Sequence, residues 1–593
     1  MTGSVASRGG AVNRSWRVAA QITGAPASRI VEQMSQPALI PRPAATLILA
    51  RDTAAGIEVF LLRRTHLAEF ASGNYVFPGG VLDPSDHDDH WTAHCETMDG
   101  AAASRLLSLE RGGLAYWVAA IRECFEEAGL LLARDRSGAL LAIDETQTAC
   151  EFAALREQLI AGSLSFAALC KARNLRLALD DIAYFSHWIT AQGRPRRFDA
   201  RFLVAVAPPL QTGSHDAGET VDHVWIRPEE ALRRHGSGEL SLMFPTIKTL
   251  GALARFADTR SLMHYARTPR AVITTMPRMA TGRGGLRPVI AGDHAYAEVG
   301  RIDPHGNGQA SCEIVPGVVT RLSAQVRRIT APNAGFMTGP GTNTYLLGSG
   351  NEIAVIDPGP ADAAHLLRLL EEAKGSEGKG RIGWILATHT HIDHSPAAAL
   401  LREHTGAELL GIPPPPHPGQ DRSFRPDRVL AHGDRISVAG CDLRVIHTPG
   451  HASNQVCYLL ENEKLLFTGD HIMQGSTVVI NPPDGDMAVY LASLRLLQHE
   501  DLEWLAPGHG FLMDRPQEMV ERLLIHRLDR ENKVRSALQR LRTATLEELL
   551  PAVYDDVPAR IHPVAGRSLL AHLDKLVAEG RATQHGERWA AGI

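Results

Sequence analysis

The alternation of hydrophobic and polar positions divides the chain into three folded blocks. In the first block, 43–260, short apolar runs separated by turn residues are typical of strands. These strands are expected at 45–50, 59–62 and 202–207. Apolar residues at helical spacing predict a helix over 114–132, and a second helix begins with a proline at 228–234. The first block is therefore expected to be an α/β domain.

The second block, 313–515, again alternates apolar strand-like runs with helical segments. Its apolar runs cover 344–348, 353–356, 382–387, 443–446, 456–460 and 465–467. This alternation is typical of a second α/β domain.

The third block, 516–593, is mainly helical and ends in two short segments around Gly586. Its helices are expected at 519–541 and 566–578, and its strands at 581–585 and 588–590. Helices followed by a hairpin resemble a winged helix. Between the first two blocks, 261–312 is rich in Gly, Asn, Thr and Arg, which predicts a linker with one strand at 288–291.

The composition is that of a globular protein in a reducing compartment. Of 593 residues, 44% are hydrophobic and 21% are charged, and the net charge of −5 is small for this length. A nearly neutral chain argues against a surface that binds nucleic acid along its whole length. The seven cysteines form no C-x-x-C pair, and no apolar run reaches the roughly 18 residues of a membrane span. We therefore expect a cytoplasmic protein without a membrane partner, and its oligomeric state stays open.

The first 42 residues are expected to be a disordered or transit-like tail. No acidic residue precedes Glu32, whereas arginine, serine and alanine are frequent. A transit peptide would place the protein in an organelle matrix. Alternatively, Met34 is the first residue of the translated protein.

A cluster of carboxylates lies on the predicted helix at 114–132. Glu123 shares a helix face with Glu126 and Glu127, because residues three and four apart are neighbours on a helix. Three like charges on one face repel one another unless a cation lies among them. Mg²⁺ and Mn²⁺ prefer such oxygen ligands, and Mg²⁺ keeps positions for substrate phosphates. The alternative is a solvated acidic helix face.

The residues around this cluster resemble the Nudix box of the Nudix hydrolases, G-x5-E-x7-R-E-U-x-E-E-x-G-U, where U is aliphatic. Gly80 matches its first glycine, Asp86 stands at its first acidic position, and Arg122 to Leu130 match the remainder, including Gly129. Asp86 replaces a glutamate, and 35 residues instead of 7 separate it from Arg122. A similar insertion occurs in the branch that includes coenzyme A diphosphohydrolases.

This resemblance implies an α/β/α sandwich that hydrolyses a diphosphate, in a coenzyme A or nucleoside derivative, with a bound cation. It implies Glu126 and Glu127 as metal ligands and Glu123 as a ligand or catalytic general base. Arg122 would position the helix through ion pairs. Glu219 is a more distant candidate carboxylate.

In the second block, side chains of the metal-ligand type stand at the ends of apolar runs. Thr388-His389-Thr390-His391-Ile392-Asp393-His394 follows the run at 382–387. Later runs end near His451, Asp470 and His509, and an earlier run ends at Asp357. We expect these side chains to converge, because loops at strand ends gather at one edge of a sheet. Imidazole and carboxylate together suit Zn²⁺, among other divalent ions.

This set resembles the metallo-β-lactamase superfamily, whose fold is an αββα sandwich. The resemblance implies two Zn²⁺ or other divalent ions, one held by His389, His391 and His451 and the other by Asp393, His394 and His509. It also implies that Asp470 is catalytic and bridges both ions, and that Asp357 orients a ligand from outside. Two such ions lower the pKa of a shared water, which supplies a nucleophile near neutral pH.

Gly341 to Leu346 and the tail at 554–573 resemble the lactamase-β-like 2 family. That family includes metal-dependent endoribonucleases that act on single strands, and the superfamily includes thioester hydrolases of the glyoxalase II kind. The implied substrate is therefore a phosphodiester, such as single-stranded RNA, or a thioester. The basic residues of 527–542 are interpreted as a solvated helix face, because acidic residues lie among them.

The sequence thus predicts a multi-domain α/β protein with a Nudix domain, a metallo-β-lactamase domain and a small winged-helix-like α+β segment. Its expected function is metal-dependent hydrolysis at two sites. In the alternative, the Nudix block is a non-catalytic ligand-binding module that regulates the second domain.

Overall fold

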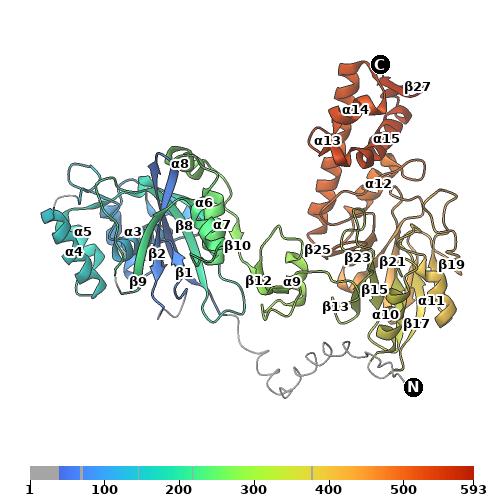
Figure 1. Cartoon of the computed structure of the whole chain (residues 1–593), viewed down its shortest axis with the longest axis horizontal. Coiled ribbons are helices and arrows are strands. Elements are labelled where there is room, and N and C mark those ends of the chain that lie inside the picture. The colour runs from blue at the N-terminus through green and yellow to red at the C-terminus, as the bar shows by residue number, and fades with distance from the viewer. Residues whose placement is uncertain are drawn as a thin grey trace, which may run out of the picture.

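The computed structural model describes residues 39–66, 71–87, 89–143, 146–216, 218–375 and 378–592. Figure 1 shows two lobes with a small unit between them and a helical domain on the second lobe. Of the tail expected at 1–42, residues 1–38 lie outside the described residues. Within the described ranges, no helix combines the length and the apolar character needed to cross a membrane.

The N-terminal lobe is built on an eight-stranded sheet with helices on both faces (Figure 1). Its main path runs β10-β7-β8-β1-β2-β3, with β4 paired to β1 and β9 to β2. The strands are β1 (Arg42–Thr53), β2 (Gly56–Arg64), β3 (Tyr75–Val76), β4 (Gly79–Val81), β7 (Ile182–Ile189), β8 (Phe198–Val206), β9 (Thr220–Ile226) and β10 (Thr274–Thr275). β5 (Ala133–Arg134) and β6 (Arg176–Leu177) form a separate pair. The helices are α2 (Gly100–Leu106), α3 (Leu114–Ala128), α4 (Thr146–Ile160), α5 (Phe166–Arg173), α6 (Pro228–Gly236), α7 (Phe244–Leu253) and α8 (Thr259–Arg267).

Strand β1 explains why this sheet is covered on both sides. Leu47 and Leu49 pack into the core that contains α3, whereas Ile48 and Ala50 pack into the core that contains α7 and α8. Successive side chains of a strand point to opposite faces, so a continuous apolar run marks a strand that is buried on both. The predicted α/β/α sandwich is confirmed.

The helix predicted over 114–132 ends earlier than expected. Gly129 has a φ of 69°, a left-handed conformation that glycine adopts without strain, and its N–H donates to the carbonyl of Phe125. Leu130 to Leu132 remain buried, so the apolar pattern continues beyond the end of α3. The predicted C-terminal end of this helix was therefore wrong.

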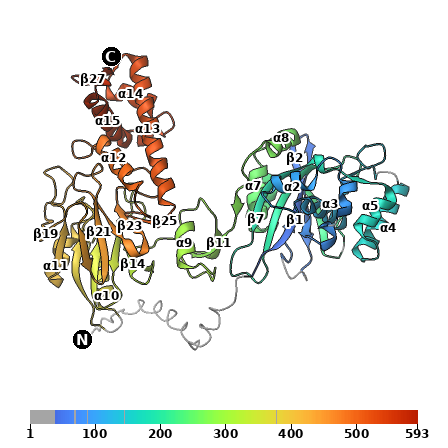
Figure 2. The same ribbon diagram turned by 180° about the vertical axis from the view of Figure 1, so that it is seen from behind.

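The segment expected to be a linker contains more structure than the one strand predicted at 288–291. β11 (Arg278–Gly282) and β12 (Gly285–Val289) form a hairpin, and α9 (Tyr296–Ile302) packs on it around Ala280, Val289 and Val299. Figure 2 shows this unit between the two lobes. Its elements are only five to seven residues long and rich in Gly, Thr and Arg, which conceals them in the hydrophobic pattern.

The second lobe contains two sheets packed face to face. The first holds β13 (Val319–Arg321), β14 (Val326–Thr330), β15 (Asn343–Leu347), β16 (Glu352–Ile356), β17 (Arg381–Leu386), β18 (Glu408–Gly411) and β19 (Arg428–Val429), in this order. The second holds β20 (Arg435–Val438), β21 (Cys441–His447), β22 (Val456–Leu460), β23 (Leu465–Gly469), β24 (Trp504–Pro507) and β25 (Met513–Asp514). One core lies between the sheets, α10 (Ala363–Lys374) and α11 (Ala397–Thr405) cover the first, and α12 (Met487–Leu497) covers the second. The predicted αββα sandwich is confirmed.

The C-terminal domain is a small α+β unit with its own core. Its elements are α13 (Pro516–Leu541), β26 (Thr543–Ala544), α14 (Leu546–Val553), α15 (His562–Ala578), β27 (Ala582–His585) and β28 (Arg588–Ala591). The last two strands form the predicted hairpin, and β26 completes a three-stranded sheet. The interpretation of 527–542 as a solvated face was wrong in part, because Arg527 and Arg530 are only 2% and 6% exposed.

Candidate metal centre and Nudix site

Three histidines from the loops after β17 and β21 face one another. Nε2 of His389 and Nε2 of His451 lie 3.0 and 3.1 Å from Nδ1 of His391. Burial lowers the pKa of His389 and of His391, so these rings are neutral. A neutral imidazole carries only one N–H, so these rings cannot provide a hydrogen bond to every nitrogen atom that faces inward. The group is suited to a metal ion bound by neutral imidazole nitrogens.

A second group contains Asp393, His394, Asp470 and His509. Nε2 of His394 lies 3.4 Å from Oδ1 of Asp470 and 3.5 Å from Oδ2 of Asp393. Nε2 of His509 lies 3.3 and 3.4 Å from the same two oxygens. Nε2 of both histidines and Oδ1 of Asp470 are buried without a hydrogen-bond partner among the described residues. Buried polar atoms normally have such a partner, so this donor set also fits a cation.

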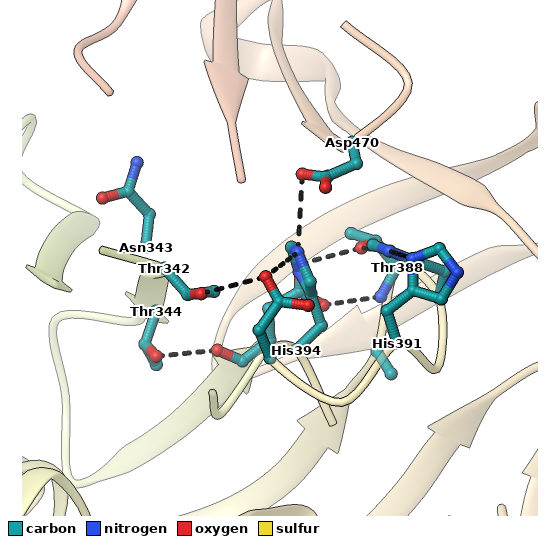
Figure 3. A network of polar contacts seen from close by, with 12 residues as sticks. Thr342, Asn343, Thr344, Thr388, His391, His394 and Asp470 are labelled. Atoms are coloured by element: carbon teal, nitrogen blue, oxygen red, sulfur yellow. Dashed lines mark hydrogen bonds and ion pairs between the residues drawn. The ribbon is translucent and has the colours of Figure 1, made fainter. Parts of the chain in front are cut away.

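Asp470, directly after β23, faces both groups. Its Oδ1 belongs to the second group, and its Oδ2 lies 3.8 Å from Nε2 of His451 in the first. Figure 3 shows Asp470 opposite His394, with His391 to the side. Within each group, the ligand atoms all lie within 4.8 Å of one another. The structure thus brings together all seven predicted side chains, in the two groups that the resemblance implies.

The outer nitrogen of three of these histidines is held by a separate acceptor. Nδ1 of His394 contacts Oδ2 of Asp357 at 2.9 Å. Nδ1 of His451 contacts the Val479 carbonyl at 2.8 Å, and Nδ1 of His509 contacts the Gly341 carbonyl at 3.1 Å. Such contacts fix the ring orientation and leave Nε2 free to bind a metal ion.

Asp357 lies where a residue that orients a ligand is expected. Besides His394, it accepts hydrogen bonds from the backbone N–H and the hydroxyl of Thr388, at 2.7 and 2.8 Å. Its φ of 51° is left-handed, a conformation in which aspartate is over-represented among residues other than glycine. Thr344 donates to its carbonyl at 2.7 Å (Figure 3). The sequence did not indicate these roles of Thr388 and Thr344. It also did not indicate the carbonyls of Val479 and Gly341, because any residue can supply a backbone acceptor.

In the N-terminal lobe, Arg122 is the centre of the Nudix-like site. Its guanidinium donates to both oxygens of buried Asp86, at 2.8 and 3.0 Å. It also donates to Glu123 at 2.9 Å and to Glu126 at 3.0 Å. These are the ion pairs predicted for Arg122. They connect Asp86, before the long insertion, to α3, which follows it.

Glu127, the last glutamate of the box, has partners other than Arg122. Oε2 of Glu127 accepts the N–H of Gly79 at 2.8 Å, and Oε1 lies 3.7 Å from Arg64. Arg64 also donates to Glu219 at 3.0 Å. A Cβ on Gly80 would lie 2.4 Å from Oε1 of Glu123, so a larger residue at this position would displace the carboxylate.

Burial disfavours the ionised form of all three glutamates. Burial, partly opposed by Arg122, raises the pKa of Glu123 to about 7. Burial, with the charge of Glu123, raises the pKa of Glu127 well above its usual value. A divalent cation would remove this conflict. In the described ranges, however, the groups with three or more gathered ligand atoms are the two of the second lobe, so the structure does not assemble Glu123, Glu126 and Glu127 in the same way.

Comparison with known proteins agrees with the geometry of the second lobe. The family model described as Metallo-beta-lactamase superfamily matches residues 337–509. The Beta-lactamase-like protein 2 homolog of Drosophila melanogaster is 32% identical over 287 residues, which cover 45% of this chain and 92% of that protein. The chain belongs to the metallo-beta-lactamase superfamily. The Atrochrysone carboxyl ACP thioesterase of Aspergillus fumigatus is 31% identical over 290 residues, which cover 46% of this chain and 86% of that protein.

This member of the metallo-beta-lactamase superfamily carries two further domains. The NUDT19 Nudix domain model matches residues 102–253, and the Beta-lactamase associated winged helix domain model matches residues 545–589. A solved Nudix hydrolase from Alicyclobacillus acidocaldarius is 31% identical, with a TM-score of 0.32, and the match covers 38% of this chain and 96% of that chain. The predicted family resemblances are confirmed. The protein is a hydrolase, and both of its larger folds imply bound divalent metal ions.

Proposed function

We propose that the metallo-beta-lactamase domain is a thioesterase with two Zn²⁺. The observation that carries this proposal is the convergence of seven candidate ligand side chains, with three buried ligand atoms that have no hydrogen-bond partner among the described residues. His389, His391 and His451 would hold one ion. Asp393, His394 and His509 would hold the other, and Asp470 would contact both. Bound there, the ions would polarise the scissile carbonyl and lower the pKa of a water molecule.

A thioester is favoured over RNA for two reasons. A relative that the chain covers over 86% of its length is named a thioesterase. In addition, two basic residues of α13, Arg527 and Arg530, are buried and are not available as a nucleic-acid surface.

The surrounding side chains would hold the reacting groups in place. Asp357 keeps the Nδ1 proton of His394 on the outer side of the ring. The hydroxyl of Thr342 lies 3.4 Å from Oδ2 of Asp393 and limits the rotation of that carboxylate (Figure 3). The chain therefore supplies a set of oriented ligands before substrate binds.

A substrate panel on the full chain tests this assignment. We expect acyl-coenzyme A and acyl-carrier-protein thioesters to be hydrolysed, the activity to be lost on chelation, and Zn²⁺ to restore it. A single-stranded RNA oligonucleotide, assayed in parallel, should stay intact. Cleavage of the RNA without any thioester hydrolysis would overturn the proposal.

For the Nudix domain, we propose hydrolysis of a diphosphate in a coenzyme A or nucleoside derivative, with Mg²⁺ or Mn²⁺. The supporting observation is the set of three glutamates on α3, of which Glu123 and Glu126 pair with Arg122. Burial raises the pKa of all three. Both domains would then act on acyl-coenzyme A metabolites, one at the diphosphate and the other at the thioester. The competing proposal is a non-catalytic module that binds such a ligand and regulates the second lobe.

The double substitution of Glu126→Gln and Glu127→Gln separates these two proposals. We expect diphosphate hydrolysis to fall on the order of a thousandfold, because metal-assisted charge stabilisation amounts to several kcal/mol. Thioester hydrolysis should be unchanged. Glu157→Gln, at an exposed position of α4, is the matched control and should leave both activities intact. If the unmutated chain binds coenzyme A derivatives but never cleaves their diphosphate, the binding module is the correct assignment.

A further inference from the structure

The loop after Asp470 lies between the metal centre and the C-terminal domain. It connects β23 to α12 and contains Val479, whose carbonyl accepts the Nδ1 contact of His451 at 2.8 Å. The residues on either side, Val478 and Ile480, are 2% and 0% exposed and belong to a core shared with α12 and α13. The direction of the Val479 carbonyl therefore depends on what holds its two neighbours.

Two side chains of the C-terminal domain hold these neighbours. Arg527 of α13 donates to the carbonyl of Val478, and Ser568 of α15 accepts the N–H of Ile480 at 3.2 Å. The contacts come from two helices and reach the residues immediately before and after Val479. The short segment 478–480 is thus held from both sides by a domain outside the αββα sandwich.

The environment of Arg527 indicates that this contact is more than surface packing. The side chain is 2% exposed, its Cζ lies 5.4 Å from the centre of the Tyr490 ring, and its Nε has no hydrogen-bond partner among the described residues. Burial of a charged group costs free energy unless it is paired or hydrogen-bonded. The bond to Val478 offsets part of this cost, so the loop and the arginine stabilise each other.

We propose that Arg527 and Ser568 are positioning residues for His451. They fix Val478 and Ile480, which fix the Val479 carbonyl, and that carbonyl holds Nδ1 of His451 so that Nε2 faces His391. The inference rests on the proposed metal centre and assigns a new role to the winged-helix domain. That domain completes the metal site from outside the sandwich.

Metal affinity of the full-length chain tests this inference directly. In Arg527→Met and in Ser568→Ala, we expect one of the two bound ions to be released about tenfold more readily to a competing chelator. This is the lower end of the range for direct partners of a metal ligand, because Arg527 and Ser568 act through the neighbours of Val479. The visible spectrum of the cobalt-substituted protein should change, because the orientation of one ligand changes. The second ion should bind as before.

Arg530→Met is the matched control, since Arg530 is a buried arginine one turn further along α13. Its partners, Asp556 at 2.8 Å and the Val553 carbonyl, belong to its own domain. This variant should lower the melting temperature and leave both metal affinities and the cobalt spectrum unchanged. Ser568→Ala removes a single hydroxyl and keeps the test valid if Arg527→Met does not fold.

Wild-type affinity for both ions in Ser568→Ala and in folded Arg527→Met would overturn the inference, as would equal weakening in Arg530→Met. An unmutated chain that binds no transition metal would instead overturn the proposed metal centre. The two failures are therefore distinguished by one measurement on the unmutated protein.

Discussion

Replacing Asp470 by asparagine should lower thioester hydrolysis on the order of a thousandfold. Asp470 is the residue that faces both ligand groups, with Oδ1 3.3 Å from His509 and Oδ2 3.8 Å from His451. Asparagine has nearly the same shape but no negative charge. Its amide nitrogen replaces one of the two carboxylate oxygens and does not bind a metal ion in its place. A metal ion contributes several kcal/mol to the stabilisation of transition-state charge, and each 1.4 kcal/mol is about a factor of ten in rate.

The measurement is kcat/KM for an acyl-coenzyme A thioester, together with the metal content of the purified variant. Asp442→Asn, at an exposed position of β21 in the same lobe, is the control and should remain within about twofold of the unmutated chain, as surface substitutions usually do. An Asp470→Asn protein that retains two metal ions and full thioester turnover would contradict the bridging role.

The candidate metal centre was predictable because its proposed ligands are side chains at strand ends. His389 and His391 follow β17, His451 follows β21, and Asp470 follows β23. A pattern of apolar runs locates these strand ends, and the topology then gathers them. The residues that orient the ligands were harder to find. Gly341 and Val479 act through backbone carbonyls, which any residue could provide at those positions.

The Nudix site shows a different limit of sequence reasoning. Helical spacing correctly places Glu123, Glu126 and Glu127 on one face of α3, but their final positions depend on residues far away in the chain. Arg122 draws Glu123 and Glu126 toward Asp86, and Gly79 holds Glu127. Spacing along a helix gives the direction in which a side chain points. Which residue it then contacts on the far side of the insertion between Asp86 and Arg122 depends on tertiary packing.

The segment 261–312 gives the largest difference between sequence and structure. Its short elements have little hydrophobic periodicity, so the pattern predicts a linker. The decisive contacts are polar and buried. Glu298 of α9 pairs with Arg328 of β14 at 2.6 and 2.9 Å, and accepts the backbone N–H of Leu512 at 2.8 Å. A lone glutamate in a short helix does not reveal a partner 30 residues away.

Replacing Glu298 by glutamine should lower the free energy of unfolding of the second lobe by about 3 kcal/mol. Glu298 and Arg328 are 1% and 2% exposed, so the substitution leaves the guanidinium buried without a countercharge. Removal of one partner of a buried ion pair typically costs about 3–5 kcal/mol, whereas an exposed pair contributes about 1 kcal/mol or less. Glu352→Gln is the control, because its pair with Arg381 is exposed on both sides.

Urea unfolding would give the free energies, and hydrogen exchange at Leu512 would locate the effect. In Glu298→Gln this amide should exchange faster, because its acceptor is weakened, and in Glu352→Gln it should not change. Equal stability of the two variants would mean that α9 is a tether with no structural role. The expected difference would instead make the unit at 278–312 part of the metallo-beta-lactamase fold. A protein cut into its two lobes would then have to be divided on the N-terminal side of this unit, before β11.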